Sequence, residues 1–152
     1  DQPEMEMIFA PLGGGGLLAG SALSAKDFSP NTTVIGTEPE QAQDGVQGLS
    51  TGKKVESFVP NTIADGLRTP VGQIPFDILK NLVSDVWLTS EKEIIDWMYR
   101  IWTELKLVIE PTSAVPFAAI NSQKEKVKGK KIAIIITGGN VDFTQLPGPN
   151  ET

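Results

Sequence analysis

The chain has 152 residues, of which 39% are hydrophobic and 21% charged, a composition typical of one folded domain with a hydrophobic core. Its net charge of −6 leaves too little basic surface to neutralise nucleic-acid phosphates, so we exclude nucleic acid as a partner. No run of about 18 apolar residues and no signal-peptide pattern is present, so we expect no membrane partner and a cytoplasmic location. Cysteine and histidine are both absent, which excludes thiolate nucleophiles, Ser-His-Asp triads and histidine-ligated zinc, and any catalysis therefore depends on a cofactor.

A run of four glycines follows the first predicted strand. Residues 5–10 form a short apolar run, typical of a strand buried on both faces, and an apolar helical pattern extends from Leu17 to Phe28. Between them lie Gly13, Gly14, Gly15 and Gly16. Residues without Cβ let a ligand approach bare N–H groups, and the N-terminus of the following helix adds unpaired donors and the positive end of its dipole. We predict a site for a phosphate monoester rather than a flexible linker, because linkers are flanked by polar residues.

The rest of the chain alternates strand and helix patterns. Further strands are predicted at residues 32–37, 85–88 and 131–136. Helices are predicted at residues 39–47, with Pro39 in the first turn, at 76–83 and at 112–122. A further helix is predicted to begin at a capping box formed by Ser90 and Glu93. Residues 48–75 are rich in glycine, proline and polar residues and predict a long irregular segment. This succession predicts a three-layer α/β fold with a mainly parallel sheet over residues 1–144, followed by a loose tail at 145–152.

Five motifs in chain order carry a family resemblance. They are the glycine loop, Gly36-Thr37-Glu38-Pro39, Thr62-Ile63-Ala64-Asp65-Gly66, Ile109-Glu110-Pro111-Thr112-Ser113-Ala114 and Thr137-Gly138-Gly139-Asn140-Val141-Asp142. From residue 7 to residue 142 the chain resembles the C-terminal half of the serine racemase and threonine/serine dehydratase family, pyridoxal-phosphate enzymes of fold type II. The resemblance implies a racemase or ammonia-lyase whose substrate is an amino acid similar to serine or threonine.

The resemblance assigns parts of the chain to pyridoxal phosphate. The four glycines would hold its phosphate, and the hydroxyl of Thr137 would face the pyridine nitrogen. A hydroxyl is a weaker partner than an aspartate, so the nitrogen stays unprotonated, which favours racemisation and β-elimination over transamination. The backbone of Gly66 would pass close to the cofactor, and Glu110 would lie beside the ring.

The lysine that forms the Schiff base is not found in this chain. In the family it lies in a Ser-x-Lys-x-Arg-Gly context in the N-terminal half, and no lysine here has those neighbours. We therefore expect the chain to be inactive alone and to be completed by an N-terminal half, as a separate chain or a missing segment. The resemblance also implies a homodimer of the complete enzyme. The alternative is a non-catalytic phosphate- or pyridoxal-phosphate-binding regulatory domain. A nucleotide-binding domain fits less well, because the glycines lack the G-x-G-x-x-G spacing.

A second site follows the strand at residues 32–37. In family members that bind a divalent ion, a glutamate is followed four and six residues later by a backbone carbonyl and a second carboxylate. Here these positions are Glu38, Ala42 and Asp44. Oxygen ligands of this kind suit Mg²⁺ or Ca²⁺ rather than zinc. The alternative is a solvated acidic turn.

Overall fold

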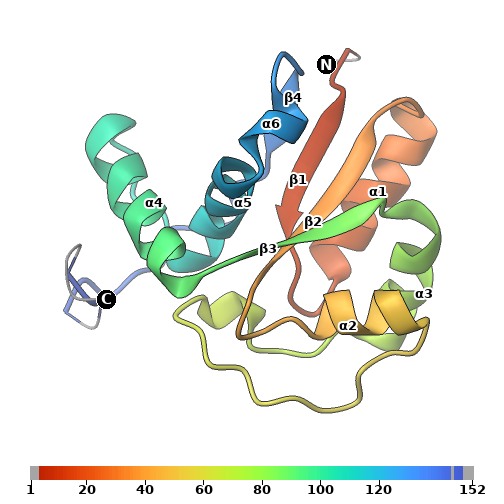
Figure 1. The fold of residues 1–152 in the computed structure, drawn as a ribbon, viewed down its shortest axis with the longest axis horizontal. Helices are drawn as coiled ribbons and strands as arrows, with labels where there is room; N and C mark the ends of the chain where they lie inside the picture. Colours follow the sequence, from red (N-terminus) through yellow and green to blue (C-terminus); the bar gives the residue numbers. More distant parts are fainter. Residues whose placement is uncertain (1–3, 145, 149–152) are drawn as a thin grey trace.

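Four parallel strands form a sheet in the computed structural model, which describes residues 4–144 and 146–148. The strands are β1 (Met7–Pro11), β2 (Thr33–Pro39), β3 (Asp85–Thr89) and β4 (Ile132–Ile134), in the spatial order β3-β2-β1-β4 (Figure 1). Every neighbouring pair is parallel, so the carboxyl ends of all four strands lie at one edge of the sheet. The predicted α/β fold with a parallel sheet is confirmed.

Helices cover both faces of this sheet (Figure 1). They are α1 (Gly16–Phe28), α2 (Asp44–Thr51), the 3-10 helix η1 (Asp65–Leu67), α3 (Gln73–Leu82), α4 (Glu91–Glu104), α5 (Pro111–Ser122) and α6 (Lys124–Val127). Along β1, Ile8 and Ala10 pack into the cluster that contains α1 and α3, whereas Met7 and Phe9 pack into the cluster that contains Ala119 of α5. Successive side chains of a strand point to opposite faces, so an apolar β1 binds a helix layer on each side.

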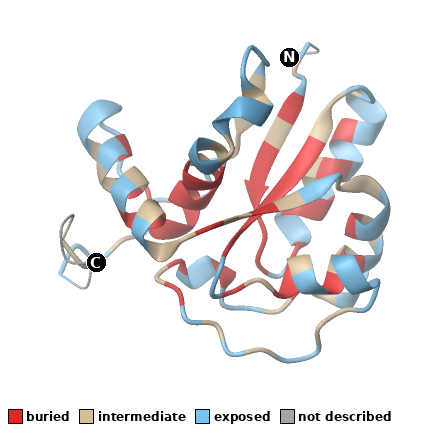
Figure 2. Cartoon of the chain, viewed as in Figure 1, coloured by how far each residue is buried: buried red, intermediate tan, exposed pale blue. Residues whose placement is uncertain are grey.

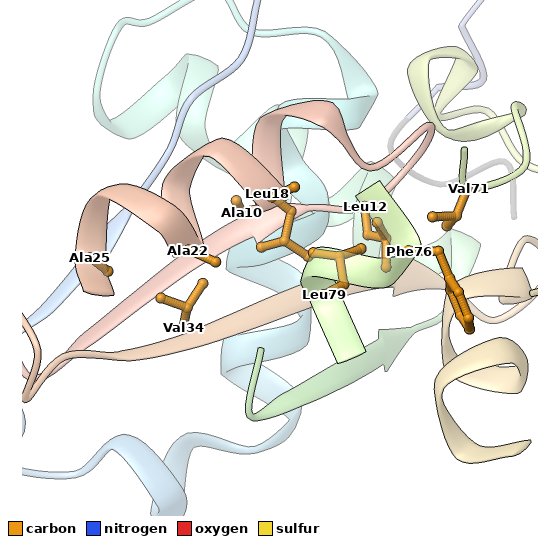
Figure 3. Close-up of a cluster of buried hydrophobic side chains, with 10 residues drawn as sticks. Ala10, Leu12, Leu18, Ala22, Ala25, Val34, Val71, Phe76 and Leu79 are labelled. Carbon is orange, nitrogen blue, oxygen red and sulfur yellow. The ribbon is translucent and has the colours of Figure 1, made fainter. Parts of the chain in front are cut away.

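Small residues bring α1 close to the sheet. Ala22 and Ala25 of α1 are buried against Val34 of β2, and Leu18 and Leu79 fill the space between α1 and α3 (Figure 3). On the opposite face, α5 is buried along most of its length, since it lies between the sheet and α4 (Figure 2). Both strands that precede the site loops, β1 and β4, thus lie between packed helix layers.

One predicted helix is wrong in its bounds. Residues 39–47 do not form a helix, because Pro39 is the last residue of β2 and α2 begins only at Asp44. After Pro39 the Glu40 N–H donates to Thr89 O of β3 at 2.9 Å, and the Ala42 N–H returns to Pro39 O at 2.9 Å. These bonds extend the strand pairing and close a turn before a helix can start. Proline tolerates the first turn of a helix, but it equally fits the end of a strand.

The capping box of α4 is confirmed. Ser90 Oγ accepts the Glu93 N–H at 3.3 Å, and the Glu93 carboxylate accepts the Ser90 N–H at 3.1 Å.

The C-terminal tail, predicted to be loose, is described in part. Residues 145 and 149–152 lie outside the described residues. Within the described part, Pro147 O accepts a hydrogen bond from the hydroxyl of Tyr99 at 3.1 Å. Over the described part of the chain, the helices are too short or too polar to cross a lipid bilayer.

Candidate cofactor-binding site

Two of the four glycines point into the protein. A Cβ on Gly13 would lie 2.5 Å from the carbonyl oxygen of Gly66, and a Cβ on Gly15 would lie 2.8 Å from Pro75 Cβ. Both distances are too short for any side chain. Gly15 also has a φ of +87°, in the left-handed region that glycine adopts without strain. These glycines are therefore required by the packing of the loop itself.

The other two glycines face outward. Gly14 and Gly16 are exposed, and a Cβ on either residue would meet no atom within 4 Å. Gly16 is the first residue of α1, whose N-terminus has no side-chain cap and no acidic residue in its first turn. The first N–H groups of a helix lack intrahelical partners, so they remain available to an anion here. The open side of the loop fits a phosphate group.

Gly66 joins the glycine loop to α5. Its carbonyl oxygen lies against Gly13, and its N–H donates to Thr112 Oγ1 at 3.2 Å. A Cβ on Gly66 would lie 2.9 Å from that same hydroxyl oxygen. The structure thus places Gly66 next to the glycine loop, and the approach of its backbone to the cofactor stays a prediction.

Thr137 follows the last strand at the same edge of the sheet. The pairing of β4 with β1 continues through the Ile135 N–H, which donates to Phe9 O at 3.0 Å, and Thr137 lies two residues further on with its side chain exposed. The buried Ser113 holds this turn, because its Oγ accepts the N–H groups of Thr137 at 3.1 Å and Gly138 at 3.0 Å. The sequence analysis gave Ser113 no role of its own, although a hydroxyl side chain within the mainly apolar segment 111–120 indicates a residue with a polar partner.

Glu110 supports the turn from the other side. It is half-buried at the N-cap of α5, its N–H donates to Gly138 O at 3.1 Å, and its carboxylate accepts the Asn140 N–H at 3.2 Å. A Cβ on Gly138 would lie 2.6 Å from the Glu110 carboxylate, so the glycine permits this close contact. The geometry gives Glu110 a part in holding the loop, and its predicted place beside a cofactor ring stays a prediction.

These groups form one continuous chain of contacts. It runs from the glycine loop through Gly66 to Thr112, and from the neighbouring Ser113 to Thr137. The loops after β1 and β4 meet because the two strands are adjacent and parallel. In open α/β sheets, ligands bind outside the carboxyl ends of the strands. The structure therefore brings the glycine loop and the Thr137 hydroxyl to the edge where ligands bind in such folds.

The residues of the predicted metal site lie at the start of α2. The Glu38 carboxylate is fully buried and accepts the N–H groups of Gly45 and Val46, both at 2.9 Å. The buried Asp44 carboxylate accepts the Val71 N–H at 2.8 Å. The alternative of a solvated turn is wrong for these two carboxylates. Within residues 4–144 and 146–148, no three histidine, cysteine or acidic side chains gather in a way that could hold a metal ion.

Burial also changes the titration of Glu38. Loss of solvation on burial is the main cause that raises its pKa to about 8; the hydrogen bonds from Val46 and Gly45 oppose the rise, and the nearby negative charge of Asp44 adds to it. The pKa of Asp44 is likewise raised by burial. Two buried carboxylates that repel each other are each costly in the charged form.

Known proteins match nearly the whole chain. Residues 1–138 match the family model described as pyridoxal-phosphate dependent enzyme. A beta-hydroxyaspartate dehydratase of Paracoccus denitrificans is 41% identical over 143 residues, which are 94% of this chain and 45% of that protein. A serine racemase of Schizosaccharomyces pombe is 47% identical over 140 residues, 91% of this chain and 43% of that protein. The solved structure of maize serine racemase is 37% identical with a TM-score of 0.88, over 93% of this chain and 45% of that one. The chain spans about half the length of the curated relatives it matches.

Proposed function

Since the chain belongs to the family of pyridoxal-phosphate dependent enzymes, we propose that it is the cofactor-binding portion of an amino-acid racemase or ammonia-lyase. Its substrates would be amino acids similar to serine or threonine, as the names of the relatives suggest. One observation carries the proposal: the open side of the glycine loop and the exposed Thr137 lie at the same edge of the sheet. A phosphate and a ring nitrogen of one small molecule can be held by these two groups together.

The residues present fit this cofactor. The N–H groups around Gly14 and Gly16 would bind the phosphate, because that side of the loop is open and the helix dipole favours an anion there. The Thr137 hydroxyl would donate to the ring nitrogen and keep it unprotonated. When bound, pyridoxal phosphate supplies an electron sink for the negative charge that develops at the substrate Cα. An unprotonated ring is the milder sink, which favours racemisation and elimination.

The remainder of the enzyme would dock on the face formed by α1 and β4. β4 is the last strand in the sheet order, so one of its edges can pair with a further strand. Beside it an open groove of about 1210 Å³ is lined by Leu17 and Phe28 of α1, Ile8 of β1 and Ile135 next to β4. Phe28 is 82% exposed, which is costly for a side chain that stays in water. We propose the lysine-bearing half as the occupant, because the relatives are about twice as long as this chain.

Other parts of the proposal concern assembly and metal binding. The complete enzyme would be a cytoplasmic homodimer. Glu38 and Asp44, with the Ala42 carbonyl, would hold Mg²⁺ or Ca²⁺, which would offset the repulsion between the two buried carboxylates. The competing function is a non-catalytic regulatory domain, favoured by the missing lysine context.

An activity assay separates the two functions. The chain is combined with a polypeptide that carries the lysine-bearing half and pyridoxal phosphate, and the products from serine, threonine and 3-hydroxyaspartate are measured as 2-oxo acid and as the opposite enantiomer. We expect turnover of at least one substrate by the combined protein and none by the chain alone. A stable complex that binds the cofactor but turns over no substrate would support the regulatory domain.

A further inference from the structure

Ser113 is a buried hydroxyl residue in the first turn of α5, directly behind the turn at Thr137 and Gly138. Its Oγ lies 3.1 Å from the Thr137 nitrogen and 3.0 Å from the Gly138 nitrogen. The same atom lies 3.0 Å from Gly138 O and 3.0 Å from Thr137 Oγ1. One side chain therefore contacts four polar atoms of two consecutive residues, and one of these atoms is the hydroxyl assigned to the cofactor.

The hydrogen-bonding capacity of Ser113 decides where the Thr137 proton can go. A serine hydroxyl accepts two hydrogen bonds and donates one. Both acceptor positions of Ser113 are taken by the N–H groups of Thr137 and Gly138. Ser113 cannot accept a third bond, so the Thr137 hydroxyl has to donate elsewhere. Its side chain is exposed at the carboxyl edge of the sheet, where the ligand is expected.

The single proton of Ser113 has two acceptors within reach, Gly138 O and Thr137 Oγ1. Gly138 O also accepts the N–H of Glu110 at 3.1 Å, so it keeps a partner when the Ser113 proton turns to Thr137. In that arrangement Thr137 accepts from Ser113 and donates outward. Hydroxyls in such a series polarise one another, which makes the outer one a better donor.

We propose that Ser113 is the positioning residue that fixes the Thr137 hydroxyl as a hydrogen-bond donor toward the ring nitrogen of pyridoxal phosphate. The inference rests on the proposed function and adds a residue and a direction to it. Because both acceptor positions of Ser113 are filled, the Thr137 proton is directed outward, where a ring nitrogen with a bare lone pair can accept it.

The test is a double-mutant cycle in the complete enzyme, with Ser113→Ala, Thr137→Val and the double variant. Ser122→Ala, which removes a hydroxyl from the far end of α5, is the matched control. The cofactor dissociation constant is measured together with the ¹⁵N chemical shift of a ring-labelled cofactor. Amide hydrogen exchange at Thr137 and Gly138 is followed without the cofactor. If Ser113→Ala does not fold, Ser113→Cys keeps the volume with a much weaker donor and acceptor and takes its place in the cycle.

We expect Ser113→Ala to weaken cofactor binding by about tenfold and to lower protection of the two amides by about tenfold, because these part-buried N–H groups lose their acceptor. The ring-nitrogen signal should move in the same direction as in Thr137→Val, and the double variant should bind no more weakly than Thr137→Val alone. Additive losses of affinity, or an unchanged ring-nitrogen signal in Ser113→Ala, would overturn the inference and leave Ser113 a structural residue. Wild-type enzyme that binds no pyridoxal phosphate would overturn the proposed function as well.

Discussion

Alanine substitutions at Gly15 and Gly14 should separate the folding role of the glycine loop from its binding role. Gly15→Ala puts a Cβ 2.8 Å from Pro75 Cβ and 3.1 Å from Val71 Cγ1, at a residue with a φ of +87°. Gly14→Ala puts a Cβ into open space, at a residue whose φ is not in the positive region. The two glycines are adjacent, so the pair is matched in position and in chemical change.

The expected magnitudes differ clearly. A residue with Cβ in the left-handed region costs about 1–2 kcal/mol, and overpacking a well-packed site costs about 1–3 kcal/mol, so Gly15→Ala should lose about 2–5 kcal/mol of unfolding free energy. At about 2–4 °C per kcal/mol for a chain of this size, the melting temperature falls by about 4–20 °C. Gly14→Ala should change it by less than about 3 °C, because the site is open and alanine restricts the unfolded chain.

The assay combines thermal unfolding followed by circular dichroism with pyridoxal-phosphate affinity of the complete enzyme. Gly14→Ala should keep the wild-type melting temperature but bind the cofactor at least about tenfold more weakly, since its Cβ occupies the side that the phosphate approaches. Equal melting temperatures for both variants would refute the packing argument. Wild-type affinity in a folded Gly14→Ala protein would refute the phosphate site.

Further predictions concern titration, capping and docking. Burial raises the pKa of Glu38 from 4.5 to about 8, so its contribution to stability is complete below pH 4.5 and is lost as pH rises through 8. With a metal chelator present, Glu38→Gln should therefore reduce the fall in melting temperature between pH 4.5 and 8, whereas the control Glu40→Gln, at an exposed residue, should leave it unchanged. Added Mg²⁺ or Ca²⁺ should raise the melting temperature only of proteins that keep Glu38. Ser90→Ala removes the cap of α4 and should cost about 1 kcal/mol in chemical denaturation. Phe28→Asp should abolish association with the lysine-bearing half in sedimentation while leaving the fold intact, and Leu23→Asp on the same helix but outside the groove should not.

The strands and most helices could be predicted because their patterns are local. The apolar run at residues 5–10 gives β1, and the capping box at Ser90 gives the start of α4, since each signal lies within the element itself. The start of α2 could not be predicted, because it depends on the Glu38 carboxylate, which reaches forward to Gly45 and Val46 only in the folded chain. Proline at residue 39 fits both a strand end and a helix start.

The sequence motifs identified the segments of the candidate site, but the contacts between those segments could not be predicted from them. The four glycines look equivalent in the sequence, yet the fold turns Gly13 and Gly15 inward and leaves Gly14 and Gly16 open. Of these four glycines, only Gly15 has a positive φ. Ser113 was hidden because its partner Thr137 lies 24 residues away along the chain. Such long-range contacts depend on strand order, which local patterns do not specify.

Backbone amide signals of the complete protein during titration with pyridoxal phosphate test the central claim most directly. If this chain holds the cofactor at the carboxyl edge of its sheet, the amides of Gly14, Gly16 and Thr137 should shift most and should saturate together with the visible absorbance band of the bound cofactor. The amide of Gly129, in an exposed turn before β4 and so away from the carboxyl edge of the sheet, should stay unchanged. A cofactor that binds with its visible band while the signals of Gly14 and Gly16 remain in place would show that its phosphate is held elsewhere, and would contradict the account.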